Sequence, residues 1–125
     1  MNVTNKTEPH HEAVAIWSTE IKKGAASMAI LAVLSRGSSY GYQIVRDLEN
    51  MDITFLAFEQ GTVYPLLRRL EKRGLLSSSW EVTDSEKPKK IYSITDQGEK
   101  ALREMKRKWS ELTIEMRKIL EGDEE

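Results

Sequence analysis

The chain has 125 residues and no cysteine, which suits a single domain and excludes disulfides, thiolate metal sites and a cysteine nucleophile. Its longest apolar run, residues 25–34, is too short to span a bilayer, and the N-terminus lacks the pattern of a secretory signal, so we expect a soluble cytoplasmic protein. The net charge of −1 does not exclude nucleic acid as a partner, because residues 21–80 carry eight lysines and arginines against five acidic residues while residues 121–125 are acidic.

The first third of the chain predicts two helical segments. Apolar residues recur at roughly helical spacing over residues 9–23, which favours a short amphipathic helix with Gly24 as its candidate interruption. Residues 25–34 are apolar on all sides, as in a helix buried between other elements. The polar residues 1–8 are expected to be frayed, and the turn cluster over residues 36–39 ends the second segment.

Two further helices are predicted in the middle of the chain. Over residues 40–51 the apolar side chains gather on one face. In the next helix they recur at i, i+3, i+4 and i+7, as Val63, Leu66, Leu67 and Leu70. Since proline is tolerated only in the first turn, Pro65 requires this helix to begin at about Gly61 or Thr62, and Gly74 suits its C-terminal end.

The periodicity then changes to that of a hairpin and a long final helix. Residues 76–82 and 90–94 are predicted as strands and residues 83–88 as the loop between them. Thr95 can cap the final helix, whose apolar residues recur in steps of three and four, namely Leu102, Met105, Trp109, Leu112, Met116 and Ile119. So regular a stripe requires a partner surface, for which we expect the same helix of a second chain, with packing on its own first helix as the alternative.

The helix that contains Val63 also has a polar, basic face. Arginine reads guanine with two hydrogen bonds and lysine neutralises phosphate, so this face suits a DNA major groove. Its residues are Thr62, Tyr64, Arg68, Arg69, Lys72 and Arg73. A lysine run at the expected hairpin tip, Lys87, Lys89 and Lys90, suits the DNA backbone or minor groove. Each feature alone is also compatible with an ordinary solvated surface, but the order of three helices and a hairpin is that of a winged helix-turn-helix.

No constellation in the sequence indicates an enzyme, a metal site or a cofactor. His10 and His11 are adjacent, so on a helix they would point about 100° apart and not act as paired ligands. There is no glycine-rich phosphate loop before a helix, and no serine has a histidine nearby in sequence. We therefore expect a binding protein.

Three motifs resemble those of the PadR family of winged-helix transcriptional regulators. They are Tyr40-Gly41-Tyr42-Gln43-Ile44, Gly61-Thr62-Val63-Tyr64-Pro65 followed by Leu67, Leu70, Glu71, Gly74 and Leu75, and Tyr92-x-Ile94-Thr95-x-x-Gly98 followed by Leu102. Over about residues 21–120 the chain resembles the short branch of that family, which has a single C-terminal helix. The resemblance implies a dimer built on the first and last helices and DNA contacts at Tyr40, Tyr42, Thr62, Tyr64, Pro65, Arg68, Arg69 and the lysine-rich wing.

The sequence departs from the family pattern in four places, of which Ala26 and Ala29, where bulkier apolar residues are common, and the longer segment before Ile21 lie outside the expected DNA contacts. Glu59-Gln60 stands where the family often has Ser-Glu, and Pro88-Lys89-Lys90-Ile91-Tyr92 stands where it usually has Pro-Arg-Lys-Tyr-Tyr. Lys89 in place of arginine loses a planar hydrogen-bonding fork but keeps the charge, so phosphate anchoring is retained.

The resemblance also implies an effector site. In multidrug-responsive members of the short branch, a tryptophan at the same distance after the Thr-x-x-Gly motif stacks on flat aromatic ligands, and Trp109 occupies that position. Two copies of so large a side chain would hold a pair of helices apart, and Ala25, Ala26 and Ala29 would add space beside them. Lys106, one turn before Trp109, would favour neutral or anionic aromatics. The alternative is that Trp109 only fills the core.

We therefore expect an α+β, mostly helical chain in three parts. These are an N-terminal extension with a short helix over residues 1–23, a winged helix-turn-helix over 24–94, and a dimerisation helix with an acidic tail over 95–125. The function expected is that of a sequence-specific regulator, a repressor released by a small aromatic effector, whose homodimer places two third helices in successive major grooves of a palindromic operator. The alternative is a winged-helix module that binds other proteins.

Overall fold

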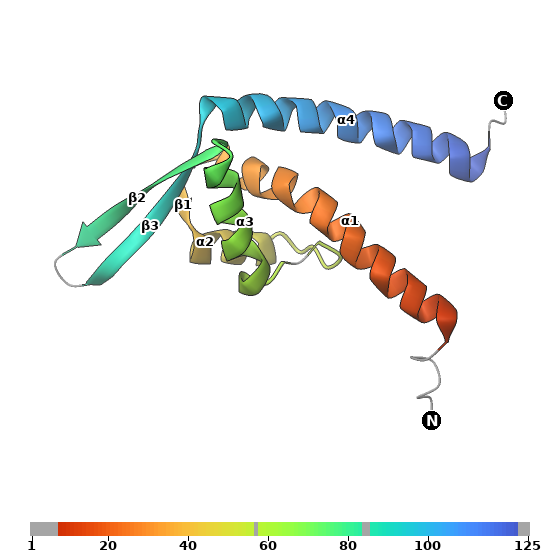
Figure 1. The fold of residues 1–125 in the computed structure, drawn as a ribbon, viewed down its shortest axis with the longest axis horizontal. Helices are drawn as coiled ribbons and strands as arrows, with labels where there is room; N and C mark the ends of the chain where they lie inside the picture. Colours follow the sequence, from red (N-terminus) through yellow and green to blue (C-terminus); the bar gives the residue numbers. More distant parts are fainter. Residues whose placement is uncertain (1–7, 57, 84–85, 123–125) are drawn as a thin grey trace.

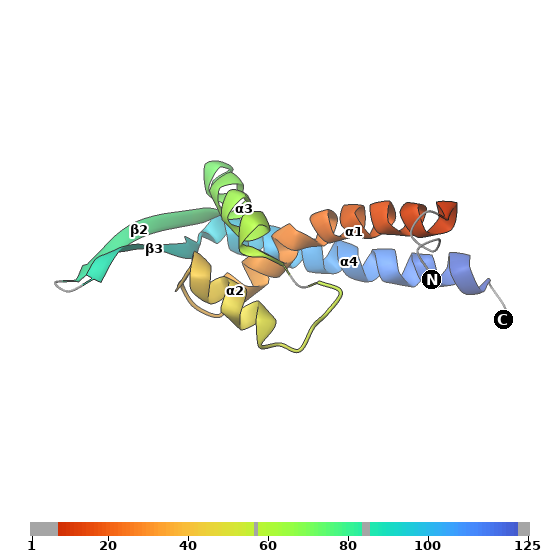
Figure 2. The ribbon, with the colours of Figure 1, turned by 90° about the horizontal axis from the view of Figure 1, so that it is seen from below.

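The computed structural model describes residues 8–56, 58–83 and 86–122. The elements are, in chain order, α1 (Pro9–Leu34), β1 (Ser39–Tyr40), α2 (Gly41–Glu49), α3 (Gln60–Lys72), β2 (Leu76–Thr83), β3 (Glu86–Ile94) and α4 (Asp96–Glu121). The three strands form one antiparallel sheet in the order β1-β3-β2. This is the predicted mostly helical α+β winged helix-turn-helix. The β2–β3 hairpin and the two long helices point away from the α2–α3 region in opposite directions (Figures 1 and 2).

Helix α1 is continuous, so the interruption expected at Gly24 is wrong. A glycine inside a helix costs only about 1 kcal/mol, and the burial of the residues after it offsets that cost. All the buried residues of α1 lie beyond Gly24, namely Ala25, Ala26, Ile30, Leu31, Val33 and Leu34. The expected boundary between residues 23 and 24 therefore falls inside one helix, at the point where its burial changes.

The core lies where the second half of α1 meets α2, α3 and the start of α4. Its largest fully buried side chains are Ile30, Leu31, Leu34, Ile44, Val63, Leu67 and Leu70. The apolar face predicted for α3 is therefore the face that packs inward. Leu102 of α4 is 3% exposed in the single chain and belongs to this core, although it was expected at a dimer interface.

The end of α3 and the start of α4 are fastened to each other by a small hydrogen-bonded joint. Gly74 has φ +82° and lets α3 end in a left-handed turn, with the Leu75 N–H donating to the Leu70 carbonyl. The Thr95 hydroxyl donates to the Gly74 carbonyl over 2.7 Å and accepts from the Gly98 N–H over 3.0 Å. A Cβ on Gly98 would collide with the Leu75 carbonyl. The Thr95-x-x-Gly98 motif therefore fixes the direction in which α4 leaves the winged helix.

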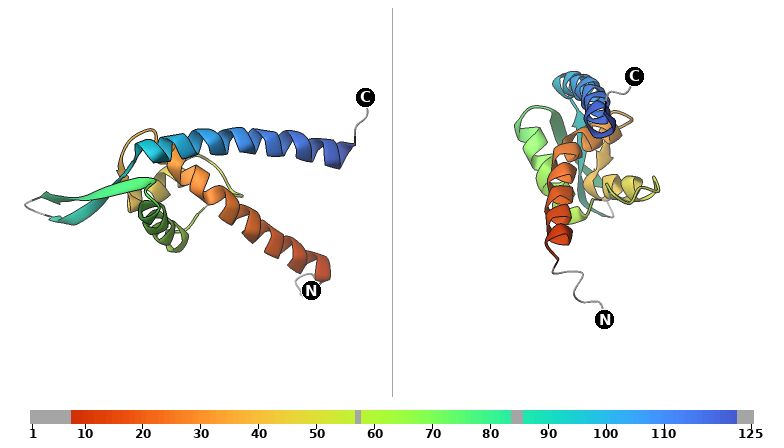
Figure 3. Two further views of the ribbon diagram at one scale, coloured as in Figure 1. Left: turned by 45° about the horizontal axis from the view of Figure 1, so that its top comes forward. Right: turned by 90° about the vertical axis from the view of Figure 1, so that its right-hand side faces the viewer.

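Helices α1 and α4 are closest near this joint and spread apart toward the two termini (Figures 1 and 3). Helix α4 has 26 residues, about 39 Å at 1.5 Å per residue. No helix in the described part of the chain is long and apolar enough to cross a membrane. Residues 1–7 of the N-terminal segment expected to fray, and residues 123–125 of the acidic tail, lie outside the described residues.

Candidate nucleic-acid interface

The exposed residues of α3 do not all face the same way, and they lie on two sides of the helix. Tyr64 and Arg68 lie on the flank toward the β2–β3 hairpin, which is the wing of the winged helix, and they line a hollow of about 450 Å³. Thr62 lies on the other flank, in a separate hollow that it shares with Lys22 and Lys23 of α1. Arg69 follows Arg68 by about 100° around the helix and lines neither of these hollows. The structure therefore does not bring all the predicted residues of α3 together.

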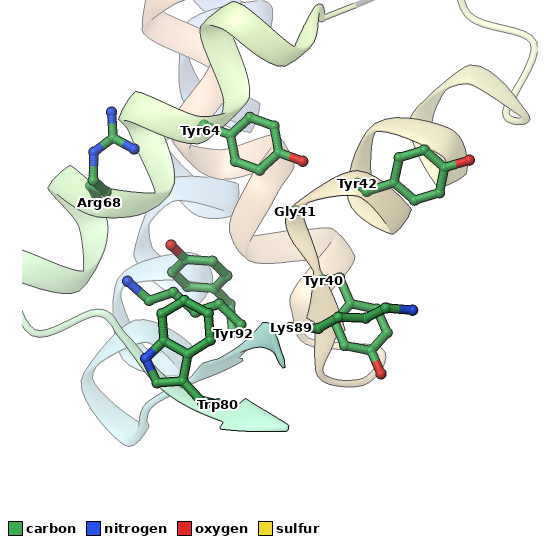
Figure 4. A pocket seen from close by; sticks show the side chains of 9 residues that line it. Tyr40, Gly41, Tyr42, Tyr64, Arg68, Trp80, Lys89 and Tyr92 are labelled. Carbon is green, nitrogen blue, oxygen red and sulfur yellow. The ribbon is translucent and has the colours of Figure 1, made fainter. Parts of the chain in front are cut away.

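The first hollow, here called the wing hollow, lies between α2, α3 and the sheet (Figure 4). It contains six of the ten residues expected to contact DNA, which are Tyr40, Tyr42, Tyr64, Arg68, Lys89 and Lys90. It also contains three that were not expected there, Gly41, Trp80 and Tyr92. Thr62, Pro65, Arg69 and Lys87 do not line it. Aromatic rings and cations both line the hollow, which suits an anionic partner that also has apolar surface.

Gly41 allows α2 and α3 to approach closely on one side of the wing hollow. A Cβ at this position would collide with the ring of Tyr64. Tyr64 is therefore half-buried against the start of α2, with its ring between the two helices. The Tyr-Gly-Tyr motif is explained here by packing, since only glycine leaves room for the Tyr64 ring.

The two tyrosines of that motif are both engaged by charged neighbours. The Tyr40 hydroxyl donates to the Glu81 carboxylate, and Lys89 Nζ lies 5.2 Å from the centre of the Tyr40 ring. Arg46 Nη1 donates to the Tyr42 hydroxyl over 2.6 Å. Arg46 is an exposed cation of this surface that sequence reasoning missed, although its i+4 spacing from Tyr42 was a usable signal.

The lysine run lies on a strand and not at the hairpin tip, where it was expected. Strand β3 begins at Glu86, so Lys87, Lys89 and Lys90 belong to the strand, whereas Asp84 and Ser85 lie outside the described residues. Lys89 is paired in register with Glu81, and Lys90 with Trp80. Because side chains alternate along a strand, the two lysines take different neighbours, Lys89 the Tyr40 ring and Lys90 the Glu71 carboxylate, although both border the wing hollow.

Lys90 is held back against α3 by Glu71. Its Nζ lies 3.6 Å from a Glu71 carboxylate oxygen and 5.3 Å from the centre of the Tyr92 ring. Glu71 also accepts a hydrogen bond of 2.6 Å from the Ser78 hydroxyl on β2. These contacts fix the wing to α3. Among the described residues, the side chains of Arg68, Arg69 and Lys87 have no ion pair or hydrogen bond, so these cations are available to a partner.

Comparison with known proteins identifies the family. The model of the transcriptional regulator PadR-like family matches residues 30–104. The crystal structure of a PadR family transcriptional regulator from Eggerthella lenta is 38% identical, with 91% of this chain and 97% of that chain covered and a TM-score of 0.79. Transcriptional regulator Rv3488 of Mycobacterium tuberculosis is 31% identical over 78% of this chain and 87% of its own length.

This chain belongs to the PadR-like family of transcriptional regulators. The resemblance seen in the three motifs is thereby confirmed, and a family of transcriptional regulators agrees with the expectation of a binding protein. A more distant PadR, that of Bacillus subtilis in complex with operator DNA, is 26% identical with a TM-score of 0.61. The match covers 65% of this chain and 45% of that one, so this PadR protein spans about half the length of that relative.

A third hollow, of about 360 Å³, lies between α1 and α4 of this PadR protein. Trp109 lines it and is 40% exposed, and Ala25 lines the opposite side. Two residues expected there do not line it. Ala29 is half-buried against the core of the winged helix. Lys106 does not line the hollow, whereas Lys108 does. Lys108 directly precedes Trp109, so the ammonium comes from a neighbouring residue and not from the preceding turn.

The two histidines lie closer together than their spacing suggested. Nδ1 of His10 and Nδ1 of His11 lie 3.5 and 3.6 Å from Glu8 Oε1, and the ligand atoms of the three residues are all within 4.8 Å of one another. The expected separation is wrong because both rings turn back toward Glu8, which precedes the first turn of α1. All three side chains are exposed, and such groups are common on protein surfaces without a metal.

Proposed function

We propose that this PadR protein is a sequence-specific DNA-binding repressor that acts as a homodimer on a palindromic operator. The observation that carries the proposal is Arg68, an exposed arginine without a partner among the described residues, on the flank of α3 that faces the wing. Arginine in this position can read guanine through two hydrogen bonds while Lys87 and Lys89 contact phosphates. The operator complex of the Bacillus subtilis PadR supports the same partner. A chromosomal operator also requires the cytoplasmic location that the sequence predicts.

The homodimer is supported by apolar surface that the single chain leaves uncovered. On α1, Trp17 is 55% exposed, and on α4, Ile119 is 74% exposed. Trp109, Leu112 and Met116 are also exposed and continue the apolar stripe of α4. Uncovered apolar side chains in such number mark an interaction site, and a second copy presents the same surface. Two-fold pairing would place the two α3 helices about one turn of DNA apart.

The effector proposal is that a small planar aromatic molecule binds in the hollow beside Trp109 and releases the operator. The aromatic and apolar lining around Trp109, Met28 and Leu112 supports such a ligand, and the Lys108 ammonium favours a neutral or anionic one. To isolate Trp109 fluorescence, Trp17→Phe and Trp80→Phe are combined, and planar aromatics of both charges are titrated. The proposal expects quenching and a Trp109→Ala variant that no longer releases DNA. An unchanged signal, or normal release by the variant, contradicts it.

The DNA proposal is tested by a mobility shift with the DNA upstream of the protein's own gene, measured over a salt series. Specific binding that weakens steeply with salt is expected, because lysines and arginines displace counterions from phosphates. Arg68→Ala should weaken binding to the specific site by about 1–3 kcal/mol and leave non-specific binding nearly unchanged. Lys89→Ala should weaken binding to all sequences and lower the log–log salt slope by about 1. Unchanged affinity in both variants, or no DNA binding by the unmutated protein, would favour the alternative of a protein-interaction module.

A further inference from the structure

We infer that Trp80 on the wing makes an apolar contact with the DNA backbone, packing its indole ring on deoxyribose beside a phosphate. The wing would then bind DNA through an apolar contact in addition to the electrostatic attraction of its lysines. This inference rests on the proposed DNA binding and adds to it a residue that neither the family motifs nor the sequence reasoning singled out.

Trp80 is a large apolar residue of the wing that lines the wing hollow and is exposed to solvent. It is 65% exposed although tryptophan is mostly buried on average, so a large apolar area faces water in the single chain. Because so little of its surface is buried, the Trp80 side chain contributes little to the stability of the fold. Large exposed apolar side chains at a site that also gathers polar groups mark a surface for a partner.

The surroundings of Trp80 specify the chemistry of that partner. Trp80 on β2 and Arg68 on α3 lie on opposite sides of the wing hollow, with Tyr64 beside Arg68 (Figure 4). Lys89 and Lys90 of β3 also line it. An occupant must therefore be anionic and must present apolar surface next to its charge. The DNA backbone has both, since each phosphate adjoins a deoxyribose, and the operator complex of the Bacillus subtilis PadR favours DNA over an acidic protein.

The strand that carries Trp80 is held in place before any partner arrives. The cross-strand neighbour of Trp80, Lys90, is paired with Glu71 of α3, and Ser78, two residues before Trp80 on the same face of β2, donates to the same carboxylate. Strand β2 is thereby anchored to α3 immediately beside Trp80. With only two side-chain torsions to fix, a tryptophan in an anchored strand loses little entropy on binding.

The test compares Trp80→Ala with Lys89→Ala in the same mobility-shift salt series. Trp80→Ala should lower affinity about tenfold at every salt concentration, the order of one aromatic contact with nucleic acid, and leave the salt slope unchanged. Trp80→Phe should restore most of the affinity. Val82→Ala is the matched control, because Val82 is an exposed apolar residue of the same strand that does not line the hollow. The melting temperature of each variant verifies that it is folded.

A direct measurement accompanies these variants. With Trp17→Phe and Trp109→Phe combined, Trp80 is the remaining tryptophan, and added DNA should quench its fluorescence. Wild-type affinity in Trp80→Ala, or a lowered salt slope like that of Lys89→Ala, overturns the inference while the proposed DNA binding stands. If the unmutated protein shows no salt-sensitive DNA binding, both the proposed function and this inference fail. Quenching by an acidic protein without quenching by DNA would assign the surface to a protein partner and overturn the inference too.

Discussion

The winged-helix region and the outer halves of α1 and α4 follow the same helical periodicity of apolar residues, but they differ in what covers those residues. In the winged helix, Leu31, Ile44 and Leu67 are completely buried by other parts of the same chain. On the outer halves, Trp17, Leu112 and Ile119 belong to the apolar sets of their helices but are exposed. The apolar stripe therefore determines that a helix forms and which face packs, while the presence of a covering partner depends on the rest of the molecule.

This difference separates a region that is complete in one chain from a region that requires a second surface. The joint formed by Gly74, Thr95 and Gly98 connects them, because it fixes the start of α4 to the end of α3. A change in how two α4 helices pack would be passed through this joint to the α3 helices. Variants in the complete region, in the uncovered region and at the joint should accordingly have distinct effects.

The largest effect is expected in the core of the winged helix. Leu67→Ala removes a fully buried side chain from α3 and should lower the free energy of unfolding by about 2–5 kcal/mol. Urea denaturation followed by circular dichroism measures this loss. Leu67→Met nearly conserves the volume and should cost less than about 1.5 kcal/mol. Equal stability of the alanine variant and the unmutated chain would show that this region is not the rigid core described above.

The next effect tests the uncovered region. Leu112→Asp or Met116→Asp would place an unpaired carboxylate in the proposed dimer interface and should weaken dimerisation roughly 100-fold or more. Sedimentation velocity separates the 14.3 kDa monomer from the dimer. Ser110→Asp adds the same charge about 160° around α4 from Leu112 and should leave the dimer intact. A folded monomer for the unmutated chain at micromolar concentration would refute the dimer.

A smaller effect is expected at the joint. Thr95→Ala removes the side-chain cap of α4 and its bond to the Gly74 carbonyl, which should cost about 1 kcal/mol. Thr95→Ser keeps both hydrogen bonds and should retain most of that stability. If the joint connects the two regions as described, the alanine variant should also bind the operator more weakly than the serine variant in the mobility shift. Identical behaviour of the two variants would show that the capping contacts carry no such coupling.

The smallest effect is expected where the wing is fastened to α3. Glu71→Gln removes the ion pair with Lys90 but retains an acceptor for the Ser78 hydroxyl. Since both partners are one-third exposed, the loss in stability should be below about 1 kcal/mol. Thermal denaturation with the unmutated protein as reference measures it. A loss of several kcal/mol would mean that the wing depends on this pair far more than its exposure indicates.

Local signals in the sequence predicted much of this fold and part of the candidate site. The apolar spacing of α3 and Gly74 at its end are properties of a few consecutive residues, so the helix and its buried face could be predicted. The start expected at about Gly61 or Thr62 is wrong, because α3 begins at Gln60 and Pro65 lies inside the helix, in its second turn. The three motifs likewise sufficed for the family. Tyr40, Tyr42, Tyr64 and Arg68 were predicted as one site, and they do line one hollow.

Other features required the tertiary structure, because they arise between segments far apart in the chain. Two residues form β1 only because β3 lies beside them, and Gly24 stays helical because the residues beyond it are buried. Register with β2 places the lysines on a strand, and the contact of Lys90 with Glu71 joins residues that no local pattern relates. A tryptophan in a serine-rich strand carries no signal of its exposure. The sequence by itself therefore determined which helices form and which family they build, whereas long-range packing decided which cations remain available and which aromatic side chains face the partner.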